Sequence, residues 1–152
     1  MRERGFTSTE LMIVVAIMGS VTAVATPSIS RWLTSIRMES ATREIASTLQ
    51  LARVKAITQN TSISIHFDTA ANTYQMQRPN SAALTTWHTV DKAKKLPAGI
   101  LFVSVTGNPV TFQSGRGSTI PGSNSTVIIQ NTQGKTNAIV VAQTGRIIVR
   151  KN

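Results

Sequence analysis

Cysteine is absent from the sequence. A disulfide framework, a thiolate metal site and a cysteine nucleophile are therefore excluded, and a folded domain must be held together by packing alone. Aromatic residues are scarce, at 5% of the chain, and only 6 acidic residues oppose 16 lysines and arginines. The formal charge of +10 favours an anionic partner, such as a phosphate backbone, a lipid headgroup or an acidic protein surface.

The length and composition indicate one globular domain with an extension. A chain of 152 residues leaves little room for a second sizeable core. Hydrophobic residues make up 41% and charged residues 14%, which is neither the composition of a disordered tail nor that of a polytopic membrane protein.

The N-terminal segment is apolar, and no charged residue occurs from Leu11 to Ala25. A helix from Phe6 to Pro27 would be about 33 Å long at 1.5 Å per residue, which is close to the thickness of a bilayer core. We therefore expect this helix to cross a membrane once. Arg2 and Arg4 precede it and favour a cytoplasmic N-terminus.

Two simpler interpretations compete for the same segment. One is a cleaved secretory signal, with Ala23-Val24-Ala25 as its small-x-small cleavage site, which would make the chain an exported β-protein. The other is an uncleaved anchor. An anchor leaves Glu10 unexplained, because a lone carboxylate at the start of an apolar helix is costly unless it is paired.

The residues before and around Glu10 resemble the signature of type IV prepilins. In that signature a Gly is followed by Phe and Thr, with Glu at the fifth position after cleavage, and Gly5, Phe6, Thr7 and Glu10 all match. The resemblance implies that a prepilin peptidase cleaves after Gly5 on the cytoplasmic side and methylates Phe6. It also implies that the carboxylate of Glu10 meets the N-terminal amine of a neighbouring subunit in a filament.

Two further positions bear on this resemblance. Pro27 lies where pilins commonly kink the helix. Ser8 and Thr9 depart from the pattern, because pilins usually carry apolar residues directly before the Glu. This departure puts in doubt how closely the subunit behaves like a major, heavily polymerising pilin.

The pattern after Pro27 predicts an amphipathic helix that continues to about residue 60. Its apolar stripe, which should cover a sheet, consists of Leu33, Ile36, Ala41, Ile45, Leu49, Ala52 and Ala56. Beyond Asn60 the period falls to two, which predicts a hairpin of residues 63–67 and 74–76. Further strands are expected at 100–105, 110–112, 126–130, 138–142 and 146–149, and the connection 79–86 should be exposed.

These patterns predict an α+β fold, with a long N-terminal helix packed on a largely antiparallel sheet, as in pilins. The helix has a membrane half and an amphipathic half. The expected organisation is a leader at 1–5, a transmembrane and filament-forming helix at 6–27, an amphipathic helix at 28–60 and a β-rich head at 61–152.

The head resembles the GspH/FimT group of pseudopilins and minor pilins. The resemblance is carried by Leu51-Ala52-Arg53-Val54-Lys55-Ala56, Trp87, Leu96-Pro97-Ala98-Gly99, Phe112-Gln113-Ser114-Gly115 and Gly145-Arg146. It implies a low-abundance subunit of the bacterial inner membrane, with a periplasmic head, that primes or caps a type IV pilus or a type II secretion pseudopilus. Its partners would be other pilins or pseudopilins. Trp87 is expected to be a packing anchor against the helix.

No catalytic, metal or cofactor site is predicted. His66 with Asp68, and His88 with Asp91, are isolated pairs, whereas a metal site needs three or four ligands and a hydrolytic site needs an oriented nucleophile. Gly115-Arg116-Gly117 lacks the spacing of a phosphate-binding loop and is expected to be a flexible turn.

The basic C-terminus is a candidate site for double-stranded DNA. In a strand, Arg146, Ile148 and Arg150 share one face, while Ile147, Val149 and Lys151 share the other. The Cα atoms of the two arginines would be about 13 Å apart at 3.3 Å per residue, which suits separated phosphates. The other candidate contacts are Arg116, Lys92, Lys94 and Lys95.

A second resemblance supports this candidate in part. FimT-type minor pilins of naturally competent bacteria bind DNA through a Gly-Arg-x-Arg element near the C-terminus. This sequence has Gly145-Arg146, but position 148 is Ile148 and the next arginine is Arg150. The element is half present, and a solvated basic edge is the alternative.

Overall fold

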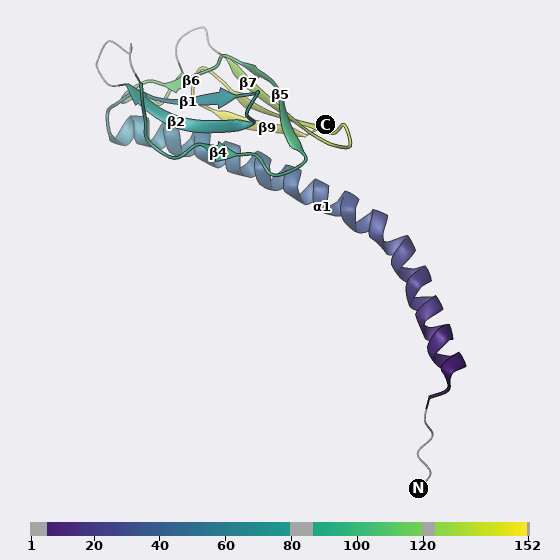
Figure 1. Cartoon of the computed structure of the whole chain (residues 1–152). Helices are drawn as coiled ribbons and strands as arrows, with labels where there is room; N and C mark the ends of the chain where they lie inside the picture. The colour runs from purple at the N-terminus through teal and green to yellow at the C-terminus, as the bar shows by residue number, and fades with distance from the viewer. Residues whose placement is uncertain (1–5, 80–86, 120–123, 152) are drawn as a thin grey trace. The chain divides into compact units, whose positions relative to one another are not determined.

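The computed structural model describes residues 6–79, 87–119 and 124–151, with no side-chain description for residues 24–28 (Figure 1). In these residues one helix, α1 (Ser8–Thr58), is followed by nine strands. The strands are β1 (Ile63–Asp68), β2 (Thr73–Pro79), β3 (Trp87–Thr89), β4 (Lys94–Lys95), β5 (Ile100–Thr106), β6 (Val110–Phe112), β7 (Ser125–Asn131), β8 (Thr136–Val141) and β9 (Ile147–Lys151).

The chain divides into two compact units, one ending at Ser35 and the other comprising Ile36–Asn152. The first unit holds the N-terminal part of α1. Within the described residues, no helical stretch is both long enough and apolar enough to cross a membrane. The expected leader and the expected kink at Pro27 lie outside the described residues or side chains and remain predictions.

The second unit contains two antiparallel sheets. The first has the order β3-β2-β1-β6, with β4 also paired to β2, and the second has the order β5-β7-β8-β9. The predicted hairpin is confirmed, because β1 and β2 pair with Ile65 opposite Met76. The five later strands predicted from the alternation are also present, as β5 to β9.

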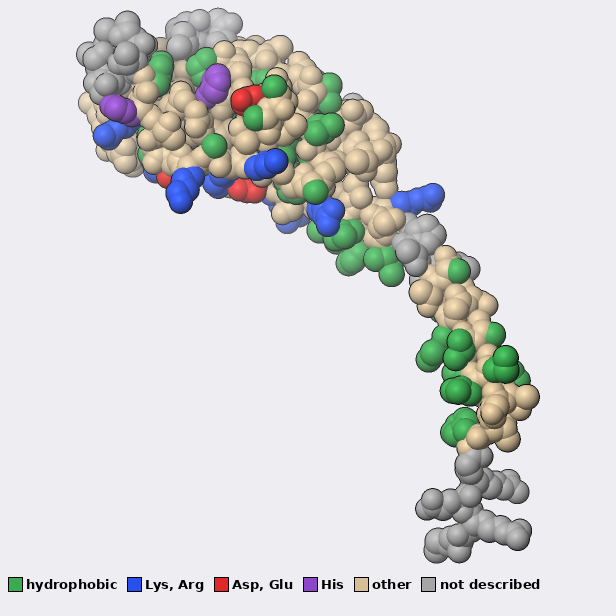
Figure 2. All heavy atoms as spheres, in the orientation of Figure 1, with side chains coloured by type: hydrophobic (Ala, Val, Ile, Leu, Met, Phe, Trp, Pro, Cys, Tyr) green, Lys and Arg blue, Asp and Glu red, His purple; other side chains and the backbone are tan. Residues whose placement is uncertain are grey.

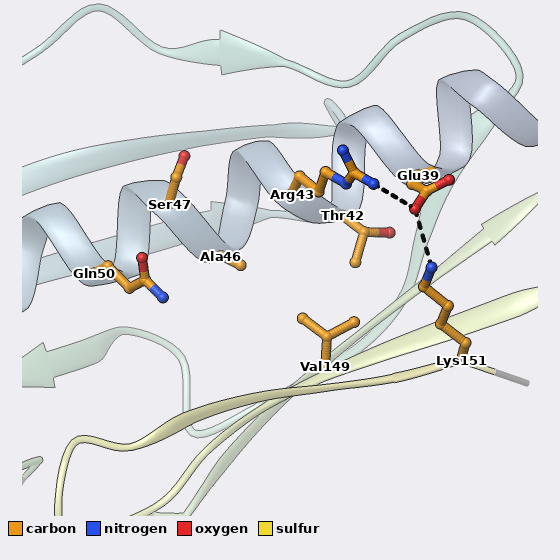
Figure 3. Close-up of a pocket in the computed structure, with 8 residues that line it drawn as sticks. All are labelled: Glu39, Thr42, Arg43, Ala46, Ser47, Gln50, Val149 and Lys151. Atoms are coloured by element: carbon orange, nitrogen blue, oxygen red, sulfur yellow. Dashed lines mark hydrogen bonds and ion pairs between the residues drawn. The ribbon is translucent and has the colours of Figure 1, made fainter.

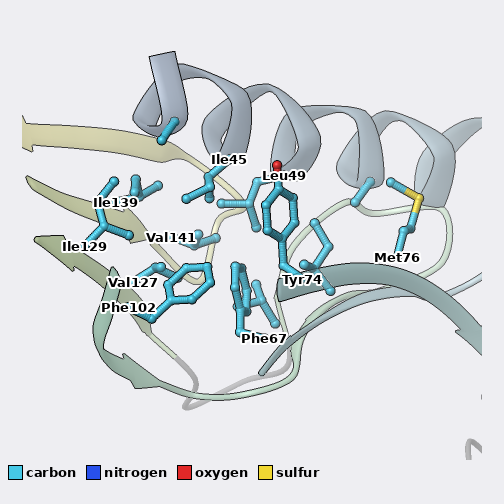
Figure 4. Packing of buried hydrophobic residues seen from close by; sticks show 14 of the residues in the cluster. Ile45, Leu49, Phe67, Tyr74, Met76, Phe102, Val127, Ile129, Ile139 and Val141 are labelled. Atoms are coloured by element: carbon cyan, nitrogen blue, oxygen red, sulfur yellow. The ribbon is translucent and has the colours of Figure 1, made fainter. Parts of the chain in front are cut away.

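The part of α1 in the second unit supplies one side of the core (Figure 4). Ile45 and Leu49 of this helix are at most 1% exposed and lie among residues from both sheets. The two sheets meet directly where the rings of Phe67 (β1) and Phe102 (β5) pack edge to face, with centroids 5.6 Å apart. This apolar burial is the main stabilising contribution in a chain without disulfides.

One buried polar contact also joins the helix to a sheet. The side-chain amide of Asn137 (β8) donates a hydrogen bond to the hydroxyl of Thr42 (α1) over 2.9 Å. Both residues are buried. Because an unpaired polar group in this position would be costly, the contact favours one register between α1 and β8.

Two details differ from the sequence prediction. The buried stripe of α1 begins later than expected, because Leu33 and Ile36 are exposed, whereas Met38 is buried. The short strands β3 and β4 were not predicted, because neither Trp87-His88-Thr89 nor Lys94-Lys95 alternates apolar and polar residues. Trp87 lies in β3, is half-buried and is outside the core cluster, and its expected role as an anchor against the helix stays a prediction.

Candidate functional site

The start of α1 forms a capping box. The carboxylate of Glu10 accepts hydrogen bonds from the backbone N–H and from the hydroxyl of Thr7, each over 3.0 Å. In return, the Thr7 hydroxyl accepts a bond from the backbone N–H of Glu10 over 3.3 Å. The arrangement satisfies N–H groups that a helix start otherwise leaves unpaired.

This capping box was not recognised from the sequence, although its signal, Thr7-x-x-Glu10, is present. Within one chain Glu10 therefore already has a local partner, and its side chain is exposed. The neighbouring Phe6 is 85% exposed, and Gly5 lies outside the described residues. The structure brings together Thr7 and Glu10, directly after the exposed Phe6, and leaves the carboxylate accessible to a second chain.

The basic residues of the head do not form one cluster. Figure 2 shows lysine and arginine side chains spread along one margin of the head, with acidic side chains among them. Lys94 pairs with Glu44 of α1 at 3.2 Å, and Lys55 pairs with Asp91 at 3.8 Å. Lys92 and Lys95 are exposed beside them. Of the predicted contacts Lys92, Lys94 and Lys95, Lys94 is thus neutralised by a carboxylate.

Lys151 lies on the face of β9 that points toward α1 (Figure 3). Its ammonium group is 3.0 Å from the carboxylate of Glu39, which also accepts a 2.8 Å bond from Arg43. Lys151 and Arg150 therefore occupy opposite faces of β9, as the alternation predicts. Lys151 and the two arginines do not form a common patch.

The hydrogen bond from Lys151, together with that from Arg43, lowers the pKa of the Glu39 carboxyl group. A lowered pKa in the folded state stabilises the fold above the ordinary glutamate pKa of about 4.3. That contribution is lost as the pH falls through the lowered value. Acid should therefore release Lys151 from α1 before it disturbs the buried core.

Replacing Lys151 with methionine should raise the pKa of Glu39 toward its ordinary value, because the largest cause of the shift is removed. Carboxyl-detected NMR titration of the head measures this directly. Lys135→Met, in the turn between β7 and β8, is the matched control and should leave Glu39 unchanged. A titration of Glu39 that is identical in the wild type and in Lys151→Met would contradict the pairing.

Arg146 and Arg150 are exposed, and no carboxylate of the described residues lies within ion-pair distance of either side chain. Arg150 pairs with Ala138 across β8 and β9, on the sheet face that points away from α1. These two arginines are thus the least neutralised of the predicted contacts in the C-terminal strand.

Arg53 of α1 holds two turns of the head in place, which was not predicted from the sequence. Its guanidinium donates to the backbone oxygen of Gly117 over 3.2 Å and to that of Thr144 over 3.5 Å. It therefore ties the turn that carries Arg116 to the turn that precedes Arg146. No local pattern could have revealed this, because the partners are 64 and 91 residues away in the sequence.

The acidic residues of the two His and Asp pairs make structural contacts, and Asp91 pairs with Lys55. Asp68 accepts hydrogen bonds from the backbone N–H groups of Ala70 and Ala71, each over 2.9 Å, and so closes the turn after β1. Among the residues that the structure describes, no group of three or more His, Cys, Asp or Glu could hold a metal ion.

Comparison with known proteins gives a family and a fold. The model of the family described as type II transport protein GspH matches residues 41–145. No curated protein matches the chain. The family match covers the last part of α1 and the β-rich head as far as the turn before β9.

Solved structures from several organisms have the same fold as this chain. The minor pseudopilin EpsH of the Vibrio cholerae type 2 secretion system aligns with a TM-score of 0.60 and 12% identity, over 76% of this chain and 97% of that one. The type IV minor pilin FimU of Pseudomonas aeruginosa aligns at 0.53 and 23%, over 74% and 87%. GspH of E. coli aligns at 0.58 and 10%, over 76% and 89%.

Proposed function

Because the chain belongs to the family of type II transport protein GspH, we propose that it is a minor subunit of a type IV pilus or of a type II secretion pseudopilus. The observation that carries the proposal is a GspH-like head combined with a helical first unit that exposes many large apolar side chains. These include Leu11, Met12, Ile13, Val15, Ile17, Met18 and Val21.

An apolar surface of this extent needs cover from lipid or from other chains. In the proposed role, lipid covers the uncharged run from Leu11 to Ala25 while the chain is inserted in the inner membrane. Other subunits cover the same run once the chain is packed in a filament. A prepilin peptidase would cleave after Gly5 and methylate Phe6. As a low-abundance subunit, the chain would prime or cap the filament.

Photo-crosslinking tests this function. A photoreactive amino acid in place of Ile17, which is 59% exposed, should form covalent adducts with other pilins or pseudopilins in sheared filaments. The same probe in place of Lys135, in the turn between β7 and β8, serves as the comparison site. Absence of the chain from filaments, with no pilin adduct at position 17, would contradict the proposal.

DNA binding is a second candidate function. It is favoured by the exposure of Arg146 and Arg150 and by the lack of a described carboxylate partner for either. The basic residues could neutralise phosphates, but no base-reading element is seen in the described part of the head. Binding to double-stranded DNA should therefore be weak, without sequence preference and strongly dependent on salt.

Alanine at Arg146 or Arg150 should each weaken DNA binding with little loss of folding, because both side chains are exposed. If each arginine makes one phosphate contact, each substitution should make the negative slope of log K against log salt shallower by about 0.9. Fluorescence titrations of the head from Ser28 onward, at several salt concentrations, measure the slope. Lys135→Ala should matter less, and unchanged binding by the double arginine variant would contradict this function.

A further inference from the structure

The outer edge of β9 is open. β9 is the last strand in the order β5-β7-β8-β9, and no other described strand pairs with it. The backbone N–H of Ala142 donates to the oxygen of Arg146 over 2.9 Å at the start of the β8-β9 ladder. Hydrogen-bonded and non-bonded pairs alternate along an antiparallel ladder, so this bond fixes which β9 residues bond to β8.

The ladder leaves every second residue of β9 with backbone groups that point away from β8. Ile148 pairs with Val140 and Arg150 with Ala138, each at a hydrogen-bonded position. The N–H and C=O groups that face outward are those of Ile147, Val149 and Lys151. The side chains of these same three residues lie on the face toward α1.

A groove runs beside this open edge (Figure 3). Its volume is about 320 Å³, which is enough for side chains of an incoming segment. Val149 forms its floor and remains 38% exposed although it faces α1. The lining residues are Glu39, Thr42, Arg43, Ala46, Ser47, Gln50, Val149 and Lys151.

We propose that the edge of β9 and this groove bind an extended, acidic segment of another protein by strand addition. The segment would pair with the outward backbone groups of Val149 and its neighbours. Successive side chains of the segment would point to opposite faces of the sheet. Apolar side chains would enter the groove over Val149, and carboxylates would lie beside Arg146 and Arg150 on the opposite face.

The charges select an acidic partner over a second copy of this chain. The groove holds one carboxylate, Glu39, against the cations Arg43 and Lys151. The outer face of β9 adds Arg150 with no described counter-charge. Pairing of two β9 strands would bring these cations close to one another, and like charges across strands are destabilising. The formal charge of +10 opposes the same contact at long range.

Defined peptides test the strand addition on the full chain in neutral detergent. The probe is a blocked, fluorescent heptapeptide, Thr-Val-Glu-Val-Asp-Val-Thr, measured by anisotropy. Methylation of the backbone nitrogens on its pairing edge should weaken binding about tenfold or more, because the ladder bonds are lost. A Lys-for-acid version of the peptide should be weaker by a similar factor. Binding that is indifferent to N-methylation would overturn strand addition.

Variants of β9 test the same contact from the protein side. Val149→Pro removes an N–H that points outward and should abolish peptide binding, whereas Val149→Thr keeps the N–H and should bind. Arg150→Glu should reduce the preference for the acidic peptide over the lysine peptide, although Arg146 and the groove cations remain. An acidic preference as large in this variant as in the wild type would overturn the electrostatic part of the proposal.

Two further outcomes also decide the question. A peptide with the sequence of residues 145–152 that binds more tightly than the acidic peptide would overturn the acidic partner in favour of a second copy. No binding of the acidic peptide at millimolar concentration would overturn the docking site itself. None of these results depends on the filament role, so failure of either proposal leaves the other testable.

Discussion

Glu10→Ala is expected to leave membrane insertion and leader cleavage intact but to reduce incorporation into filaments by about tenfold or more. The substitution removes the carboxylate that would pair with the N-terminal amine of a neighbouring subunit. An amine left without its counter-charge in an apolar surrounding is costly. The measurement is the fraction of the chain in sheared filaments, with total membrane-bound chain as the reference.

The capping box at Thr7 requires matched controls, because Glu10→Ala also removes a helix cap. Glu10→Gln can still close the capping box but carries no charge, so it should fail to assemble as Glu10→Ala does. Thr7→Ala loses the threonine hydroxyl but keeps the carboxylate, and it should assemble. If Glu10→Gln assembled like the wild type, the cap and not the charge would be the role of this residue.

Gly145→Ala is expected to lower the free energy of unfolding of the head by about 3 to 4 kcal/mol. Gly145 has φ +77°, a conformation that alone costs a residue with a Cβ about 1–2 kcal/mol. An added Cβ would also meet the backbone oxygen of Gly117, and would lie 2.9 Å from Nε of Arg53. The two turns that Arg53 ties together would have to separate.

Gly134→Ala isolates the cost of this close approach. Gly134 has φ +82°, but an added Cβ there would meet no atom within 4 Å. It should therefore lose only the conformational part, about 1–2 kcal/mol. Urea unfolding of both variants measures the difference, and equal losses would show that the contact between the two turns contributes nothing.

The sequence predicted most of the fold because its periodicity is local. Alternation at Ile63, Ile65 and Phe67 gave the face of β1 that is buried, and the later strands were found in the same way. The helix stripe was correct from Ala41 onward, but its start was not, because burial of Met38 depends on how far the sheets extend over α1. Where the buried stripe begins is set by tertiary packing, which leaves no periodic signal in the sequence.

The candidate sites divide in the same way. The spacing from Gly5 to Glu10 is readable because the motif is contiguous in the sequence. The partner of Lys151, Glu39, is 112 residues away, and the tie made by Arg53 is also long-range. The open edge of β9 follows from the strand order, which alternation alone does not determine. Because Lys94 and Lys151 pair with carboxylates of α1, the number of basic residues in the sequence overestimated the basic surface that is free to bind an anion.

The central claim is that this member of the GspH family is matured as a prepilin and enters a filament. Intact-mass analysis of the chain extracted from membranes tests it most directly. The mass should correspond to a chain that begins at Phe6 and carries one added methyl group, and Gly5→Leu should retain residues 1–5. A mature chain that begins after Ala25 would contradict the account, because it would have lost Glu10 and the apolar part of α1.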